Sequence, residues 1–61
     1  MKFNQLTKRL RKAGCLIVRN GAEHDIWYSP ITGLRASVPR HGSQEVPIGL
    51  LRKIEKDLLG L

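Results

Sequence analysis

The first apolar residues of the chain recur at helical spacing. They are separated by three and four positions, which places them on one stripe of a helix: Phe3, Leu6, Leu10 and Ala13. Lysines and arginines occupy much of the remaining surface of this segment. Gly14 follows, and glycine tolerates the positive φ at which helices commonly end. The pattern predicts an amphipathic helix over residues 3–13.

Three segments with the composition of β-strands come next, at residues 15–19, 24–29 and 34–38. The dipeptide Asn20-Gly21 predicts a turn after the first segment, although the connection to His24 is longer than a two-residue hairpin loop. Proline and glycine within residues 29–33 predict the second turn, since proline fixes φ and glycine frees it. We therefore expect three antiparallel strands.

Alternation in the second strand separates its side chains into two faces: His24, Ile26 and Tyr28 on one, Asp25 and Trp27 on the other. Because both faces carry apolar residues, the pattern leaves the inward face open. Trp27 is a candidate for stacking on an unpaired base. In a domain with so few aromatic residues, however, a tryptophan is more often part of the core.

The third strand and the last helix have clearer patterns. Apolar residues of the strand alternate with polar ones, as in a strand with one solvated face: Leu34, Ala36 and Val38. Pro47 suits the first helical position, where its missing N–H costs nothing. The apolar stripe of the final helix then follows: Ile48, Leu51, Ile54 and Leu58. Gly60 is expected to end this helix.

The predicted order is helix, three antiparallel strands, helix, an α+β fold in a single domain at residues 1–61. Two amphipathic helices need a common apolar surface, and one face of the sheet supplies it. The opposite face of the sheet is then left exposed.

The charge of the chain points to its partners. Eleven lysines and arginines stand against five acidic residues, a net charge of +6. Such an excess attracts polyanions, and nucleic acid is the expected target. No segment approaches the roughly 20 apolar residues of a membrane-spanning helix, and the basic N-terminal segment lacks the apolar core of a signal peptide. We therefore expect a cytoplasmic location.

Cys15 is the only cysteine, which excludes an internal disulfide, and no set of cysteines and histidines has the spacing of a structural zinc site. We expect Cys15 to be a small buried residue at the start of a strand rather than a reactive thiol. A chain of 61 residues builds only a small core, so a stabilising partner or oligomerisation is expected.

His24 is the candidate for chemistry. Histidine is the residue type whose unperturbed pKa, about 6.5, suits proton transfer near neutrality. RNA is cut without a metal when its own 2′-hydroxyl attacks the adjacent phosphate, and the catalyst then supplies proton transfer and positive charge. By itself, a histidine at the start of a strand is more often a structural or surface residue.

Other chemistries find less support. The acidic residues show no spacing that gathers several carboxylates around Mg²⁺, and no glycine-rich loop followed by lysine is present. We therefore expect neither a metal nor another cofactor. His41, in the segment Pro39-Arg40-His41-Gly42, either shares the acid and base roles with His24 or is a solvated loop residue.

The order of the motifs resembles the HicA toxin family. A basic helix ends at Gly14, and an apolar strand then leads into the motif Asn20-Gly21-Ala22-Glu23-His24. Further along the chain come Val38-Pro39-Arg40-His41, Glu45-Val46-Pro47-Ile48-Gly49 and Leu51-Arg52-Lys53-Ile54. Each piece is short, but their order and spacing across essentially the whole chain are fairly specific to that family.

The resemblance implies a fold like that of double-stranded-RNA-binding domains and a metal-independent endoribonuclease that cleaves mRNA. It assigns the catalytic role to His24 and implies a HicB-type antitoxin as the partner that blocks the site. The candidate RNA contacts are Arg19, Gly21, Arg35, Arg40 and His41. One position departs from the family pattern, because Ala22 stands where the family commonly has serine.

Two other functions compete with the toxin hypothesis. A binding module for duplex RNA would have the same fold and read the shape of the duplex through phosphates and 2′-hydroxyls. Such modules usually concentrate lysines at the start of their last helix, which here reads Pro47-Ile48-Gly49-Leu50. A ribosome-associated structural protein would fit the size and basicity alone.

Overall fold

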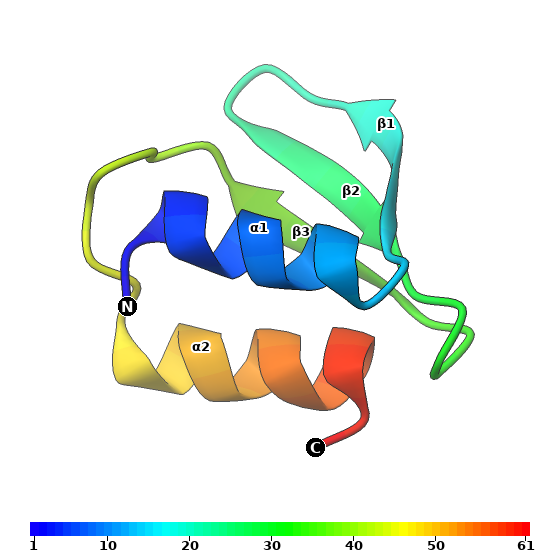
Figure 1. The fold of residues 1–61 in the computed structure, drawn as a ribbon. Helices are drawn as coiled ribbons and strands as arrows, with labels where there is room; N and C mark the ends of the chain where they lie inside the picture. The colour runs from blue at the N-terminus through cyan, green and yellow to red at the C-terminus, as the bar shows by residue number, and fades with distance from the viewer.

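Two helical segments cover one face of a three-stranded sheet in the computed structural model, which describes residues 1–61 (Figure 1). The elements in chain order are α1 (Phe3–Lys12), β1 (Leu16–Asn20), β2 (His24–Tyr28), β3 (Arg35–Pro39), α2 (Ile48–Ile54) and η1 (Glu55–Leu59), a π-helical turn that continues α2. The α+β order expected from the sequence is confirmed. None of the helices has the length and apolar content needed to cross a lipid bilayer.

The register of the sheet decides which face of β2 is turned inward. The strands are antiparallel in the order β1-β2-β3. Trp27 pairs with Ala36, and Asp25 pairs with Val38. Trp27 is 2% exposed and Val38 1%, so this face packs against the helices. His24 therefore lies on the opposite, uncovered face.

One cluster of buried apolar residues holds the two layers together: Phe3, Leu6, Leu10, Cys15, Trp27, Val38, Val46, Ile54 and Leu58. The predicted stripe of the first helix is thus confirmed at three of its positions, while Ala13 is partly buried against the cluster. Trp27 and Cys15 are both 2% exposed, as expected for core residues.

Two predicted core positions and one helix boundary are wrong. Leu34 is 51% exposed, because it belongs to the turn before β3, where its N–H is bonded to the Thr32 hydroxyl. Ile48 is 65% exposed, because the covered part of the last helix is its C-terminal half, around Ile54. Pro47 caps α2 from outside rather than forming its first helical residue.

The second turn of the sheet, at residues 29–33, is tied to the C-terminal end of the last helix. The buried Ser29 hydroxyl donates a hydrogen bond of 2.5 Å to the Leu58 carbonyl oxygen. The Thr32 hydroxyl donates one of 2.5 Å to the Asp57 carbonyl. These bonds satisfy carbonyls that a helix end leaves without partners, and they fix the turn and η1 to each other.

Candidate active site

The turn between β1 and β2 delivers His24 to the start of its strand. The Gly21 N–H donates a hydrogen bond of 2.8 Å to the His24 carbonyl oxygen. A Cβ atom at position 21 would lie 2.5 Å from that oxygen, closer than real contacts allow. Glycine is therefore required here for a close approach of the backbone, and the predicted Gly21 turn has a steric reason.

Arg40 lies on the segment that follows β3 and hydrogen-bonds to this turn. Its Nη2 donates hydrogen bonds to the carbonyl oxygens of Gly21 and Ala22, the latter at 2.7 Å. Its backbone N–H donates a third, of 3.0 Å, to the Glu23 carbonyl. Three consecutive carbonyls of the turn thus share one residue as their partner.

Asp25 completes this arrangement on the inward face. Its Oδ1 accepts a hydrogen bond of 3.0 Å from the Asn20 side-chain amide and lies 3.6 Å from Nη1 of Arg40. The Asp25 side chain is only 9% exposed, and a buried carboxylate needs such partners. We refer to Asn20, Asp25 and Arg40 as the Arg40 brace. The brace links Asn20 and Asp25, at the two ends of the turn, to each other and to Arg40, which follows β3.

Three of the predicted site residues share the uncovered face of the sheet. His24 is exposed and pairs with Pro39 at one end of the β2–β3 ladder. Arg19 pairs with Ile26, two residues from His24 along the same face. Arg35 pairs with Tyr28 at the far end of that ladder, about 13 Å along the strand at about 3.3 Å per residue. Arg19 is therefore the cation nearest to His24 on this face.

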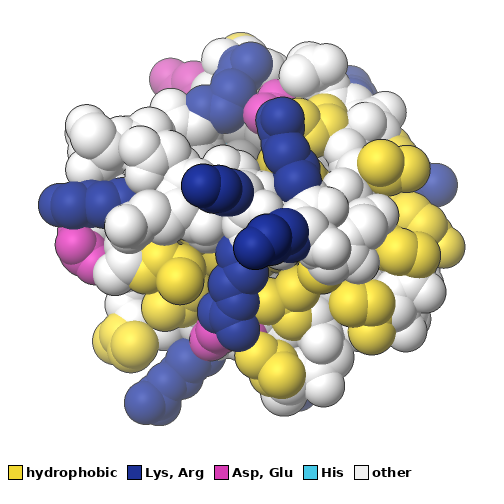
Figure 2. All heavy atoms as spheres, in the orientation of Figure 1, with side chains coloured by type: hydrophobic (Ala, Val, Ile, Leu, Met, Phe, Trp, Pro, Cys, Tyr) yellow, Lys and Arg dark blue, Asp and Glu magenta, His cyan; other side chains and the backbone are white.

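The other predicted contacts lie elsewhere. Arg40 belongs to the brace on the inward side, and its guanidinium is already engaged. His41 packs edge-on against Phe3, with ring centroids 5.3 Å apart, on the loop after β3. Figure 2 shows lysine and arginine side chains across the helical face and no histidine in view. The predicted site is thus divided between the two faces of the sheet.

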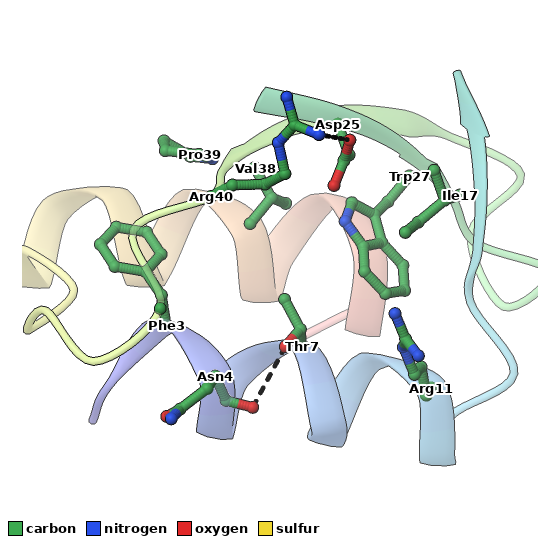
Figure 3. Close-up of a pocket in the computed structure, with 11 residues that line it drawn as sticks. Phe3, Asn4, Thr7, Arg11, Ile17, Asp25, Trp27, Val38, Pro39 and Arg40 are labelled. Carbon is green, nitrogen blue, oxygen red and sulfur yellow. Dashed lines mark hydrogen bonds and ion pairs between the residues drawn. The ribbon is translucent and has the colours of Figure 1, made fainter. Parts of the chain in front are cut away.

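A hollow of about 320 Å³ opens on the inward side, between α1 and the sheet (Figure 3). Its walls include Phe3, Thr7, Arg11, Asp25, Trp27 and Val38. The guanidinium of Arg11 lies 5.5 Å from the centre of the Trp27 ring, a cation–π contact. His24 is not among the residues that line the hollow.

Sequence reasoning missed the roles of Asn20 and Asp25. The sequence places Asp25 on the same face of its strand as Trp27 but names no partner for it. No group of three or more histidine, cysteine, aspartate or glutamate side chains comes together in a way that would hold a metal ion. The available signal was the alternation of Asp25 with Trp27. Once Trp27 is placed in the core, Asp25 faces inward too and requires a partner.

Comparison with known protein families identifies the family of this chain. The family model described as HicA toxin of bacterial toxin-antitoxin matches residues 3–59, nearly the whole chain. The chain belongs to the HicA toxin family. No curated protein and no solved structure matches it. The family is one half of toxin–antitoxin systems, so membership implies an antitoxin partner.

Proposed function

We propose that this HicA chain is an endoribonuclease that cleaves mRNA and uses His24 as its general acid or base. The observation that carries the proposal is an exposed imidazole on an uncovered sheet face, held by a turn that Gly21 and Arg40 fix from two sides. A rigid support of this kind is what positions a proton-transfer group. Arg19, the nearest cation on the face, would contact the phosphate.

The chemistry requires no group beyond the RNA and the side chains. The 2′-hydroxyl oxygen attacks the adjacent phosphorus, the bond from phosphorus to the 5′ oxygen breaks, and a 2′,3′-cyclic phosphate and a 5′-hydroxyl remain. His24 removes the proton from the 2′-hydroxyl or supplies one to the leaving oxygen, and solvent balances the other transfer. Positive charge from Arg19 stabilises the crowded phosphorane.

In this proposal Arg40 and Gly21 position His24 rather than bind RNA. The Arg40 guanidinium already serves carbonyls of the turn, and the Gly21 N–H already serves the His24 carbonyl. Arg35 would contact the backbone of the RNA farther along the strand. His41, packed on Phe3, would be a flanking contact rather than a second proton-transfer group.

The test is cleavage of a long single-stranded RNA in EDTA by the purified protein, His24→Ala and His41→Ala, resolved on a denaturing gel. We expect fragments from the parent and from His41→Ala, and none from His24→Ala. The fragments should carry 5′-hydroxyl ends, which a polynucleotide kinase labels directly. Equal cutting by the His24 variant would remove the assignment, and loss of cutting in EDTA would show that a metal is required.

We further propose that a HicB-type antitoxin silences the toxin by covering the uncovered sheet face, and that the pair acts in the cytoplasm, where mRNA is found. This face combines Arg19 and Arg35 with apolar surface at Leu16, which is 62% exposed. An acidic, partly apolar partner fits such a surface. Co-expression with the adjacent reading frame should give a stable complex without cleavage, and failure to form one would count against the toxin assignment.

The fold is also compatible with one alternative function, that of a duplex-RNA-binding module without catalytic activity. The element order agrees with it, but the first basic residues of α2, Arg52 and Lys53, lie in its last turn rather than its first. A gel-shift assay separates the two functions, since strong preference for duplex RNA without cleavage would favour the module.

A further inference from the structure

The hollow beneath the sheet holds a carboxylate oxygen that no protein group uses. Oδ1 of Asp25 accepts from Asn20 and faces Arg40. Oδ2 accepts no hydrogen bond from the protein, and in Figure 3 this second oxygen is on the side of the carboxylate away from Arg40, toward Trp27. No buried side-chain oxygen or nitrogen lacks a partner, so water reaches this oxygen, and Asp25 is among the residues that line the hollow. An acceptor in such a position favours a ligand that donates a hydrogen bond.

The other residues that line the hollow indicate the shape and charge of that ligand, and the volume indicates its size. Its apolar walls are the rings of Phe3 and Trp27 and the side chain of Val38, which suit a flat, largely apolar group. Arg11 at the rim favours an anion attached to that group and disfavours a lysine or arginine side chain. A volume of about 320 Å³ lies at the lower end of small-ligand sites.

We propose that the hollow binds one base of the RNA substrate, and that it selects bases carrying an exocyclic amino group. Adenine, cytosine and guanine each carry an exocyclic amino group that donates to a carboxylate oxygen, whereas the donor on the uracil pairing edge is its ring N3–H, which is flanked by two carbonyl oxygens that a carboxylate repels. This inference rests on the proposed RNA-cleaving function and adds a specificity site to it.

The position of the hollow relative to His24 makes the two compatible. Pro39 lines the hollow and is also the residue that pairs with His24 in the ladder. One end of the hollow and the imidazole therefore lie at the same end of the sheet, on its two faces. An RNA strand crossing this end, near Arg40 and Gly42, places a base on one side and a neighbouring phosphate on the other.

The direct test is binding of the four nucleoside monophosphates, followed by NMR through the indole N–H of Trp27, the only tryptophan. AMP, CMP and GMP should shift this signal at millimolar concentration. UMP should bind about tenfold more weakly, the size expected when one hydrogen bond to a charged group is lost. Equal binding of UMP, or no shift with any nucleotide, would overturn the proposal.

Phenylalanine substitutions inside and outside the hollow provide matched variants for the binding experiment. Thr7→Phe and, as a second variant, Asn4→Phe place a ring in the hollow from α1 without touching the Arg40 brace. Ile48→Phe places the same ring on an exposed position of α2 outside the hollow. The first two should abolish nucleotide binding and Ile48→Phe should preserve it. Binding that survives in both filled variants would contradict the assignment.

Cleavage gives an independent readout. Cut sites of the parent should be enriched in adenine, cytosine or guanine beside the broken bond, and Thr7→Phe should cut these sites no faster than sites flanked by uracil. If the parent cuts no RNA, the proposed function fails, while nucleotide binding still decides whether the hollow is a base site. If only the antitoxin, and no nucleotide, shifts the Trp27 signal, the hollow is a protein-binding site instead.

Discussion

The two turns of the sheet are held by opposite means. The turn at residues 29–33 is tied to the C-terminal end of the last helix through Ser29, which is fully buried, and Thr32. The turn at residues 20–24 is exposed, and the carbonyls of Gly21 and Ala22 are held by one side chain from the segment that follows β3, that of Arg40. The 29–33 turn is hydrogen-bonded to the C-terminal end of the last helix, whereas the 20–24 turn is hydrogen-bonded to an exposed arginine.

This difference separates stability from chemistry along the same three strands. Loss of a hydroxyl at the 29–33 turn takes the main donor from a carbonyl of η1, which destabilises the whole fold. Loss of a contact at the 20–24 turn moves His24 while leaving the buried cluster intact. Variants at the 20–24 turn should therefore change the rate of RNA cleavage, and variants at the 29–33 turn should change the free energy of unfolding. Four substitutions test that division.

Gly21→Ala should have the largest effect. The added Cβ would lie 2.5 Å from the His24 carbonyl oxygen, so the backbone at His24 must move. We expect cleavage to fall about 100-fold, as displacements near 1 Å at a catalytic group commonly cause, equivalent to about 2.7 kcal/mol in the barrier. The measurement is single-turnover cleavage of one defined RNA.

Gly49→Ala is the control for that substitution, since no atom lies within 4 Å of a Cβ at position 49. It should leave cleavage unchanged and raise stability slightly, because alanine is the better helix former. A Gly21→Ala protein that cuts at the parental rate would show that the tight turn does not position His24.

Ser29→Ala should come next, at about 1–3 kcal/mol of unfolding free energy, because the Leu58 carbonyl loses its hydroxyl donor and keeps only the weak thiol of Cys15. Urea unfolding measures the loss, with Ser37→Ala, exposed on β3, as the matched control. Cleavage per folded molecule should not change. Unaltered stability in the Ser29 variant would place the fastening of this turn elsewhere.

Arg40→Ala should lower kcat about tenfold, or about 1.4 kcal/mol, with little change in KM. Arg40→Lys should restore activity only in part, because an ammonium group does not reproduce the fork of a guanidinium. The salt dependence of RNA binding should stay unchanged in both variants. Arg19→Ala should instead raise KM and reduce the salt slope by about one, as removal of a phosphate contact does.

A reversed outcome would restore the phosphate-binding role first expected for Arg40. If Arg40→Ala reduces the salt slope while kcat is preserved, its guanidinium contacts RNA rather than the turn. Thermal unfolding of both arginine variants provides the check that the comparison is made on folded protein.

The two turns also show what the sequence reveals and what it does not. The stripe of α1 and the place of His24 at the start of β2 were predictable, because they depend on local spacing and on the Asn20-Gly21 signal. The engagement of Arg40 was not, since its carbonyl partner at Ala22 lies 18 positions away. Apolar residues on both faces of β2 hid the inward direction of Asp25 until the packing of Trp27 fixed it.

The smallest expected effect belongs to Cys15→Ala. The thiol lies 3.5 Å from the Leu58 carbonyl oxygen, the same acceptor that Ser29 uses. A thiol is a weak donor, and Ser29 still satisfies the carbonyl when the thiol is removed, so we expect a loss below about 1 kcal/mol. The two substitutions share an acceptor and should not be additive, with the double variant losing more than the sum of the single losses. Urea unfolding of the two single variants and the double variant measures that coupling. Strict additivity would mean that the thiol contributes only packing, and the hold on the 29–33 turn would then rest on the two hydroxyls alone.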